Sequence, residues 1–325
     1  MKIRAIRFHE TGGPEVLKLE EIDLAEPGPG EIRVRVKAAG VNYIDTYQRS
    51  GLYKIPLPSG IGLEAAGIVE AVGKDVTRVK IGDRVAYASG PAGAYAEAHN
   101  VSAARVVKIP ASVTDEQAAA MMLKGLTVRY LIKQTYPVKA GETVLFHAAA
   151  GGVGLIACQW LRALGVTVIG TVGSEAKAQL ARAHGAEHII LYRKEDVAKR
   201  VRELTGGKGV PVVYDSVGKD TFVSSLDSLQ RRGLMVSFGN ASGPVTGVDL
   251  SILTQKGSLY VTRPTANDYA TTTEELEEAA ADLFDAVSRG WVKIEIHQRY
   301  KLADAIQCHR DLESRKTTGA SVILP

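Results

Sequence analysis

Cysteine is scarce in this chain of 325 residues, which contains only Cys158 and Cys308. Two cysteines exclude a disulfide framework, and the lack of a C-x-x-C pair excludes the common cysteine clusters that hold zinc. Both cysteines lie in segments with a helical pattern, so we expect them to be small, buried, apolar side chains. The seven histidines are spread along the chain. We therefore expect no metal site.

Long apolar runs and a strong excess of one charge are also missing. No run is long enough to span a bilayer, and residues 1–10 (MKIRAIRFHE) lack the apolar core of a signal peptide. The 40 basic and 36 acidic residues give a net charge of only +4, and the excess is dispersed. The charge therefore argues against a nucleic-acid partner, and we expect a cytoplasmic protein without a membrane partner.

The length of 325 residues suggests about two domains. The composition, 45% hydrophobic and 23% charged, is typical of a globular protein. In the first part, the run at residues 31–37 alternates apolar side chains at 32, 34 and 36 with basic ones at 33, 35 and 37, which is typical of a half-buried strand. Turn signals separate this run from its neighbours. These features predict a mostly antiparallel β domain with strands at residues 3–8, 31–37, 65–72, 83–88 and 94–98. A helical run at residues 115–134 follows.

A glycine-rich loop then dominates the chain, within residues 143–165 (TVLFHAAAGGVGLIACQWLRALG). It is flanked by a short β-prone run and a helical run. Compared with the dinucleotide-binding pattern G-x-G-x-x-G, the loop has Ala149, Gly151 and Gly154 at the three glycine positions, with Gly152 and Val153 between the last two. Gly151 would let the backbone approach a pyrophosphate, and Gly154 would let the helix pack closely on the strand. The motif alone is weak, because a glycine-rich turn without a ligand has the same pattern.

The flanking sequence strengthens this interpretation. Five further short apolar runs follow the loop, most of them separated by helix-like segments; they lie at residues 166–171, 188–191, 211–215, 234–239 and 258–263. Such alternation predicts an α/β domain with a doubly wound, parallel, six-stranded sheet that binds a dinucleotide at the carboxyl ends of its strands. After residue 263 the pattern changes to helices at residues 273–289 and 303–314 and a strand at residues 321–324. We expect this tail to return to the first domain.

Five ordered motifs give the chain a plain resemblance to a known family: residues 9–17 (HETGGPEVL), 40–53 (GVNYIDTYQRSGLY), 62–73 (GLEAAGIVEAVG), 82–87 (GDRVAY) and 147–155 (HAAAGGVGL). They resemble the zinc-independent, NADPH-dependent quinone oxidoreductases of bacterial type, within the medium-chain dehydrogenase/reductase superfamily. The resemblance implies a GroES-like β domain and a Rossmann domain. We accordingly expect the GroES-like domain at residues 1–124, the Rossmann domain at 125–264, and a return to the first domain at 265–325.

Departures from the wider superfamily bear on metal binding. Zinc alcohol dehydrogenases have a cysteine ligand near the position of Asn42 and a histidine ligand at the position of Leu63. A catalytic zinc needs about three protein ligands and a structural zinc needs four, and neither set is present. His147, at a strand end beside the glycine loop, is expected to be a packed or capping residue rather than a base.

The strand at residues 166–171 indicates which nicotinamide cofactor is used. NAD-specific sites place an acidic residue at the end of this strand, whereas the chain has Gly173 and Ser174, with Lys177 one helical turn further on. Ser174 can donate a hydrogen bond and Lys177 supplies a positive charge, which together predict NADPH. Glu175 lies between them, and we expect it to point outward. Lys177 as a plain solvated lysine is the alternative.

The remaining cofactor contacts rest on the resemblance. Asn42, Thr127 and Tyr130 are similar to residues that flank the nicotinamide and phosphates, and Tyr192 to one beside the adenosine phosphate. A turn cap for Asn42 and a packed aromatic for Tyr192 are the alternatives. Further contacts implied by the family are Val217, Phe238, Gly239, Asn240, Ala241, Arg263, Pro264 and Arg315, the last of which is otherwise a surface arginine.

The predicted chemistry is hydride transfer from the nicotinamide to a quinone, whose activated carbonyls need little Lewis-acid help. Asn42, Tyr47 and Tyr53 are the candidates to line the substrate cleft and to hydrogen-bond the developing oxyanion. Either tyrosine is otherwise a packing residue. Reduction of an enone or alkenal double bond is the leading alternative, and a non-catalytic role like that of RNA-binding or crystallin relatives is the second.

The last strand of the predicted sheet indicates a partner. Residues 258–263 (SLYVTR) are outermost in a 3-2-1-4-5-6 strand order and have no proline or inward charge before Arg263 to block pairing. An unprotected edge of this kind predicts a homodimer through the edge strand, as the resemblance also implies. Coverage of the edge by the loop at residues 240–246 is the alternative.

Overall fold

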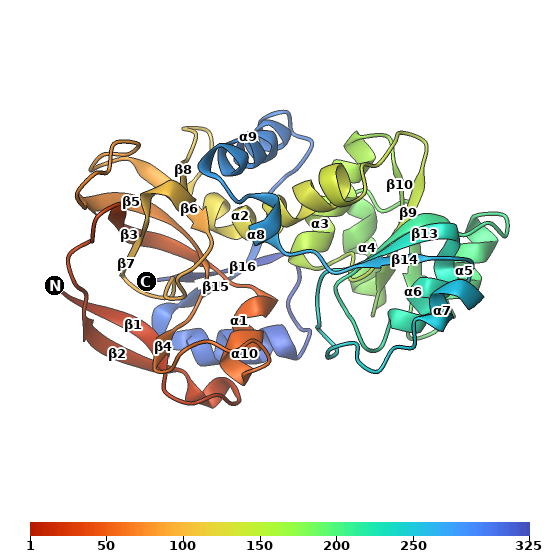
Figure 1. Ribbon diagram of the computed structural model, residues 1–325, viewed down its shortest axis with the longest axis horizontal. Helices are drawn as coiled ribbons and strands as arrows, with labels where there is room; N and C mark the ends of the chain where they lie inside the picture. The colour runs from red at the N-terminus through yellow and green to blue at the C-terminus, as the bar shows by residue number, and fades with distance from the viewer. The chain divides into compact units, whose positions relative to one another are not determined.

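The computed structural model describes residues 1–325, which form two compact units (Figure 1). Unit 1 comprises Met1–Leu126, Ala270–Phe284 and Ile294–Pro325. Unit 2 comprises Thr127–Tyr269 and Asp285–Lys293. None of the helices has both the length and the hydropathy that crossing a bilayer would require.

Unit 1 is built on two β-sheets, and nearly all of its strand pairs are antiparallel. The smaller sheet has the order β2-β1-β4, with β1 at Lys2–Phe8, β2 at Lys18–Asp23 and β4 at Ser59–Gly60. The larger sheet has the order β15-β16-β3-β5-β6-β8, and β7 also pairs with β3. Its strands are β3 (Glu31–Gly40), β5 (Glu64–Val72), β6 (Arg84–Ala88), β7 (Ala98–Ser102), β8 (Val106–Lys108), β15 (Ile296–Lys301) and β16 (Ala320–Leu324). The pair β15 and β16 is parallel.

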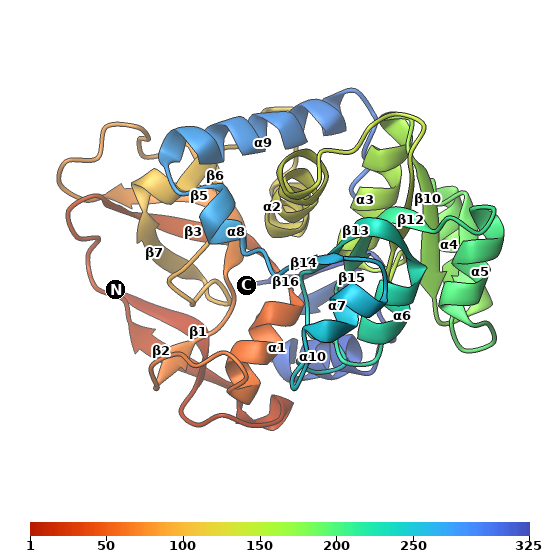
Figure 2. The ribbon, with the colours of Figure 1, turned by 45° about the vertical axis from the view of Figure 1, so that its right-hand side comes forward.

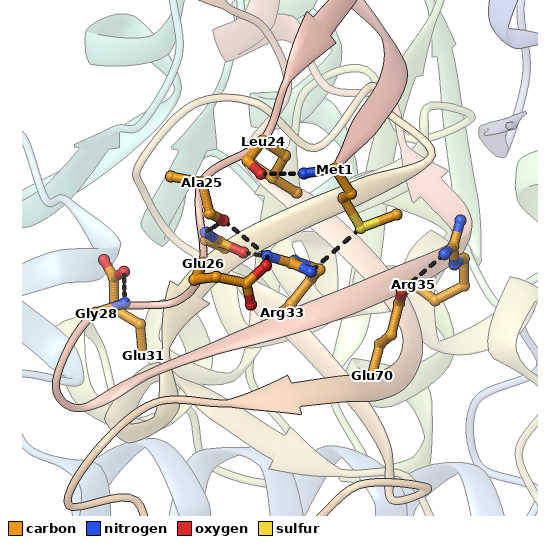
Figure 3. A network of polar contacts seen from close by, with 10 residues as sticks. Met1, Leu24, Ala25, Glu26, Gly28, Glu31, Arg33, Arg35 and Glu70 are labelled. Atoms are coloured by element: carbon orange, nitrogen blue, oxygen red, sulfur yellow. Dashed lines mark hydrogen bonds and ion pairs between the residues drawn. The ribbon is translucent and has the colours of Figure 1, made fainter.

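Strand β3 departs from simple alternation at Arg33. Its inward side chains Ile32, Val34 and Val36 are buried as predicted, but Arg33 is also only 4% exposed. The segment before the strand folds over this arginine (Figure 3), where Nη2 donates to Ala25 O at 2.8 Å and pairs with a Glu26 carboxylate oxygen at 3.1 Å. A basic residue on the outer face is therefore buried because the chain supplies it with acceptors.

The predicted strand at residues 94–98 is wrong, because a continuous ladder begins only at Ala98, where β7 starts, and Ala96 forms just an isolated bridge with Ala5. The preceding residues make single contacts with several segments: Tyr95 N donates to Ile61 O at 3.0 Å and Glu97 N to Arg4 O at 3.0 Å. The buried Tyr95 hydroxyl donates to Asp45 Oδ2 at 2.9 Å. Small residues alternating with larger ones in this stretch mark close packing rather than a ladder.

Helices complete unit 1, and two of them, α2 and α9, run on into unit 2. Helix α1 (Tyr43–Ser50) follows β3, and α10 (Ala305–Glu313) lies between β15 and β16 in the chain. The helix α2 (Asp115–Tyr130) continues into a π-helical turn at Leu131–Thr135. The long helix α9 (Thr273–Ser288) follows the short α8 (Ala266–Tyr269), which belongs to unit 2. Single 3₁₀ turns of unit 1 occur at Pro14–Val16, Ala103–Arg105 and Leu302–Asp304.

Unit 2 has the predicted Rossmann architecture. Its six strands follow the order β11-β10-β9-β12-β13-β14, and every neighbouring pair is parallel. The strands are β9 (Thr143–Phe146), β10 (Thr167–Val172), β11 (His188–Leu191), β12 (Val210–Asp215), β13 (Leu229–Ser237) and β14 (Tyr260–Thr262). The helices are α3 (Gly152–Ala163), α4 (Glu175–Ala183), α5 (Val197–Leu204), α6 (Phe222–Ser228) and α7 (Ser251–Gln255). The fold-class prediction is confirmed.

The alternation of strand side chains explains the double winding. Leu145, Ile169 and Val213 point to one face and pack with Val201 of α5 and Leu226 of α6 in one buried cluster. Figure 2 shows α6 and α7 on this same side of the sheet. Residues at the intervening positions are also buried, so both faces are covered. The carboxyl ends of all the strands therefore meet at one edge, where the loops can form a site.

Candidate functional site

The glycine loop between β9 and α3 has a geometry that only small residues permit. Gly151 is the N-cap of α3, and the helix begins at Gly152. A Cβ at Gly154 would lie 2.4 Å from Ala148 O, so only glycine allows the first turn of α3 to sit this close to the loop. Ala149 is fully buried and donates its N–H to Thr171 O at 3.1 Å. The loop therefore presents the N–H groups of a helix start at the sheet edge.

The loop after β10 places a second helix start, that of α4, at the same edge of the sheet. Ser174 is the N-cap of α4, and its hydroxyl accepts from Lys177 N at 3.4 Å. A Cβ at Gly173 would lie 2.7 Å from the Tyr192 hydroxyl, which shows how near this tyrosine comes. Glu175 is exposed and lies 3.6 Å from Arg182, on the same helix. Gly173, Ser174, Lys177 and Tyr192 thus lie together, and the acid points outward along the helix.

The loops after β12 and β13 are tied to each other. Ala241 N donates to Ser216 O at 3.2 Å, and Ser242 N donates to Val217 O at 2.8 Å. After β14, Arg263 Nη1 donates to Ser237 O at 3.0 Å and to Gly239 O at 2.9 Å. This brings together, at the ends of these strands, the predicted residues Val217, Phe238, Gly239, Asn240, Ala241, Arg263 and Pro264. Arg263 is used here in holding the backbone.

His147 is a packed residue, as predicted. It is 1% exposed, with Nδ1 at 3.0 Å from Thr171 Oγ1 and Nε2 at 3.0 Å from Ser225 Oγ. Because the Ser225 hydroxyl donates to Asp215 Oδ2 at 2.7 Å, Nε2 of His147 must carry the proton and donate to Ser225. Burial lowers the pKa of His147. The neutral imidazole, which follows β9, therefore links this strand end to β10 and to α6.

Asp215, at the end of β12, is the central acceptor of this hydrogen-bond network. Its Oδ1 accepts from Val217 N at 2.8 Å and Gly218 N at 3.0 Å, and its Oδ2 accepts from the hydroxyls of Thr221 and Ser225 at 2.7 Å each. All four contacts fix the turn that carries Val217. The sequence analysis missed Asp215, although an acid closing an apolar strand was a signal for it.

Two predicted residues lie on α2, at the start of unit 2. The Tyr130 hydroxyl is hydrogen-bonded to the Thr127 side chain. The Tyr130 ring stacks on Tyr269, with centroids 4.6 Å apart and planes inclined by 15°. Burial raises the pKa of Tyr130 to about 12, so its phenol stays protonated at neutral pH.

The other predicted residues belong to unit 1. Asn42 is the N-cap of α1 and is 8% exposed. The rings of Tyr47 and Tyr53 meet edge to face, with centroids 5.3 Å apart, and Tyr53 N donates to Tyr47 O at 3.0 Å. Tyr47 is 9% exposed and Tyr53 is 36% exposed, so only the second has an exposed side chain. Arg315 is exposed and follows α10.

Three charged residues around Asn42 escaped the sequence analysis. Asn42 Nδ2 donates to Glu64 Oε2 at 2.7 Å, and Lys124 Nζ lies 3.2 Å from the same oxygen. The backbone N–H of Asn42 donates to Asp45 Oδ2 at 2.8 Å. Glu64 and Asp45 are 0% exposed and Lys124 is 5% exposed. For Glu64 and Lys124 the available signal was a charge inside an apolar run, as in GIGLEAAGIV and AAAMMLKGL.

The donor set around Asn42 does not fit zinc. Leu63 offers no ligand, the Asn42 amide is engaged with Glu64, and the Lys124 ammonium would repel a second cation at that carboxylate. Elsewhere in residues 1–325, no group of three or more His, Cys, Asp or Glu side chains is arranged to hold a metal ion. The absence of a metal requirement remains a prediction.

The Asp45 carboxyl should make stability depend on pH. Burial raises its pKa to about 7, Lys124 and Glu64 are the charges that face it, and its Oδ1 has no hydrogen-bond partner. The unfolded chain ionises Asp45 near pH 4, so between about pH 4 and 7 the native state binds more protons and loses stability as pH rises. The difference in unfolding free energy, Asp45→Asn minus wild type, should therefore rise across this window, by on the order of 3 to 4 kcal/mol.

Urea unfolding at several pH values measures this difference. Subtracting the wild type removes the opposite trend from the buried His99 and His309, whose pKa values burial lowers to about 4 and about 3. Asp83→Asn is the matched control, because hydrogen bonding to Lys108 lowers the pKa of Asp83 and moves its effect below pH 4. A constant difference for Asp45→Asn from pH 4 to 7 would contradict the prediction.

Comparison with family models covers both parts of the chain. Residues 28–111 match the model described as alcohol dehydrogenase GroES-like domain, and residues 152–285 match the model described as zinc-binding dehydrogenase. The chain is 61% identical over 323 residues to a quinone oxidoreductase of Pseudomonas aeruginosa, covering 99% of each chain. It is 44% identical to a 2-haloacrylate reductase of Burkholderia, also over 99% of each chain.

A solved structure is equally similar. The quinone oxidoreductase of Escherichia coli, crystallised in complex with NADPH, superposes with a TM-score of 0.98 at 57% identity, covering 99% of this chain and 100% of that one. The similarity therefore extends over both units, including the glycine loop and the segment that carries Asn42.

Proposed function

The chain belongs to the quinone oxidoreductase family, and we propose that it reduces quinones with NADPH by hydride transfer, without zinc or flavin. The observation that carries the proposal is the pair of helix starts at α3 and α4, with Ser174 and Lys177 where NAD-specific sites have an acid. The relatives named quinone oxidoreductase, and the E. coli structure that contains NADPH, support the same cofactor and reaction.

The residues of unit 2 fit a dinucleotide. The N–H groups at the start of α3 are suited to the pyrophosphate, and the start of α4 with Lys177 to the 2′-phosphate. Tyr192, beside Gly173, would lie by the adenosine phosphate. The rest would be lined by Val217, Phe238, Gly239, Asn240, Ala241, Arg263 and Pro264. When bound, NADPH supplies the hydride. Thr127 and Tyr130 would then hold the nicotinamide half.

Unit 1 supplies the remaining roles in this proposal. Asn42 would contact the nicotinamide half, and Arg315 the nucleotide. Tyr53, the more exposed of the two tyrosines, would contact the quinone, while Tyr47 packs against Tyr53. The phenol of Tyr53 can donate a hydrogen bond to the oxygen that gains negative charge.

Steady-state kinetics test the proposal. The chain should oxidise NADPH with simple quinones and should use NADH poorly. Enones and aldehydes belong in the same panel, because activity with enones alone would move the assignment to double-bond reduction. The 2-haloacrylate reductase of Burkholderia, at 44% identity, is the observation that keeps this second candidate. A chain that binds NADPH and reduces none of these acceptors would refute both.

Chelation should leave this activity unchanged. Leu63 offers no ligand where a zinc site would need one, the Lys124 ammonium would repel a cation at Glu64, and the quinone carbonyl needs little Lewis-acid help. Prolonged incubation with a strong chelator, followed by elemental analysis, should show full activity and less than stoichiometric zinc. One tightly held zinc per chain, or activity that returns only with added zinc, would contradict the prediction.

We further propose that the protein is a cytoplasmic homodimer joined through β14. The cytoplasm supplies NADPH, which supports that location. The exposed edge of β14 supports the dimer, because Tyr260 is 61% exposed and Val261 is 39% exposed at the last strand of the sheet.

A further inference from the structure

Asn42 is held by two buried carboxylates, one at each of its nitrogen atoms. Asp45 Oδ2 accepts the backbone N–H at 2.8 Å, and Glu64 Oε2 accepts the side-chain Nδ2–H at 2.7 Å. Both carboxylates are 0% exposed, and Asp45 is itself held by the Tyr95 hydroxyl at 2.9 Å. These two carboxylates therefore fix both the position of Asn42 at the start of α1 and the direction of its amide.

Glu64 is in turn held in a single orientation. Its Oε1 accepts from the backbone N–H of Leu123 at 2.8 Å, and its Oε2 faces the Lys124 ammonium at 3.2 Å. The carboxylate also lies tightly against the backbone of β3, since a Cβ at Gly40 would lie 2.2 Å from Glu64 Oε2. The Leu123 backbone N–H can only donate a hydrogen bond. One oxygen of the Glu64 side chain therefore stays with Leu123, and the other faces Asn42 and Lys124.

The chemistry of the carboxylate fixes the amide. An ionised carboxylate accepts hydrogen bonds and donates none, so the Asn42 amide must face it with its NH2 group. A rotated amide would place Oδ1 against Glu64 and lose a charge-assisted hydrogen bond. The Lys124 ammonium balances the negative charge, which makes the buried ion tolerable.

We propose that Glu64, with Lys124 as its counter-ion, is the positioning residue that sets the donor and acceptor directions of Asn42 for the nicotinamide half of NADPH. This inference rests on the proposed function, and extends it to residues that do not themselves touch the cofactor. It predicts that the group at position 64, a hydrogen-bond acceptor or a donor, decides which way the Asn42 amide faces.

The variant Glu64→Gln replaces the acceptor that faces Asn42 with a donor, with little change in shape. Because Leu123 N–H still requires an acceptor, the glutamine oxygen stays there and its NH2 replaces Oε2. Two NH2 groups then face each other unless the Asn42 amide rotates. Affinity for NADPH should fall roughly threefold to tenfold, the effect of losing one neutral hydrogen bond. Affinity for adenosine 2′,5′-bisphosphate, which lacks the nicotinamide half, should not change.

A double variant separates positioning from stability. Glu64→Gln alone leaves the buried Lys124 ammonium without its counter-ion, and should lower the melting temperature. Glu64→Gln with Lys124→Met contains no buried charge pair, so the melting temperature should recover while the loss of NADPH affinity persists. A purely structural role would instead restore both together, and would overturn the proposal.

Fluorescence titration of wild type and both variants with the two nucleotides gives the result. Selective loss for NADPH in both variants supports the proposal. Equal loss for the two nucleotides, or no loss for either, overturns it. A wild type that binds NADPH but reduces no quinone would refute the proposed reaction alone, since the titration does not depend on turnover.

Discussion

Lys177→Ala is expected to weaken NADPH binding by roughly 10- to 100-fold and to leave NADH binding almost unchanged. A charge-assisted contact to a phosphate contributes about 1.5 to 3 kcal/mol, and only NADPH has the 2′-phosphate. Lys177 lies in the first turn of α4, where the helix dipole and the backbone N–H groups already favour an anion. Losing the ammonium should therefore affect one cofactor selectively.

Lys199 offers a matched control at the same helix position. It lies in the first turn of α5, and its N–H donates to the N-cap Asp196 at 2.9 Å, as Lys177 N donates to the N-cap Ser174. The acidic cap of α5 would repel a phosphate, so Lys199→Ala should change neither affinity. Identical wild-type titration curves for NADPH and NADH, or an equal loss of both in Lys177→Ala, would contradict the assignment.

The sheet of unit 2 could be predicted from the sequence because its signal is local. Each strand is a short apolar run, and the helix between runs forces parallel pairing, which leads to the observed strand order. Strand bounds were less accurate. β13 begins at Leu229 rather than 234, and β14 is limited to Tyr260–Thr262. These ends depend on which neighbour the backbone meets, which the sequence of one strand does not show.

The site could be predicted only where its residues follow strand ends. Ser174 and Lys177 have a position relative to β10 that can be counted along the chain. Glu64 and Lys124 could not be paired in this way, because they are 60 positions apart in sequence and meet only through the packing of α2 on β5. The burial of Arg33 depends likewise on a preceding segment that folds back over β3.

The edge strand β14 carries the last prediction, a homodimer that dissociates when the edge is charged. β14 pairs with β13 on one side only, through Tyr260, Val261 and Thr262. The loop at residues 240–246, the alternative cover, bonds back to the turn after β12 through Ala241 and Ser242 instead. A two-fold copy of β14 would satisfy the open backbone groups of both chains.

Leu259 is unsuited to test this interface, because its side chain is 6% exposed within the core and its N–H donates to Leu253 O at 3.0 Å. Tyr260→Asp with Val261→Asp changes exposed side chains and places like charges across the two-fold axis. Such juxtaposition costs several kcal/mol, so dissociation should become at least about 100-fold easier. Val223→Asp, at an exposed valine on α6, is the control, since Val223 is 54% exposed and far along the chain from β14. Sedimentation at micromolar concentration should show the wild type and the control as dimers and the double variant as a folded monomer. A monomeric wild type or a dimeric double variant would refute the interface.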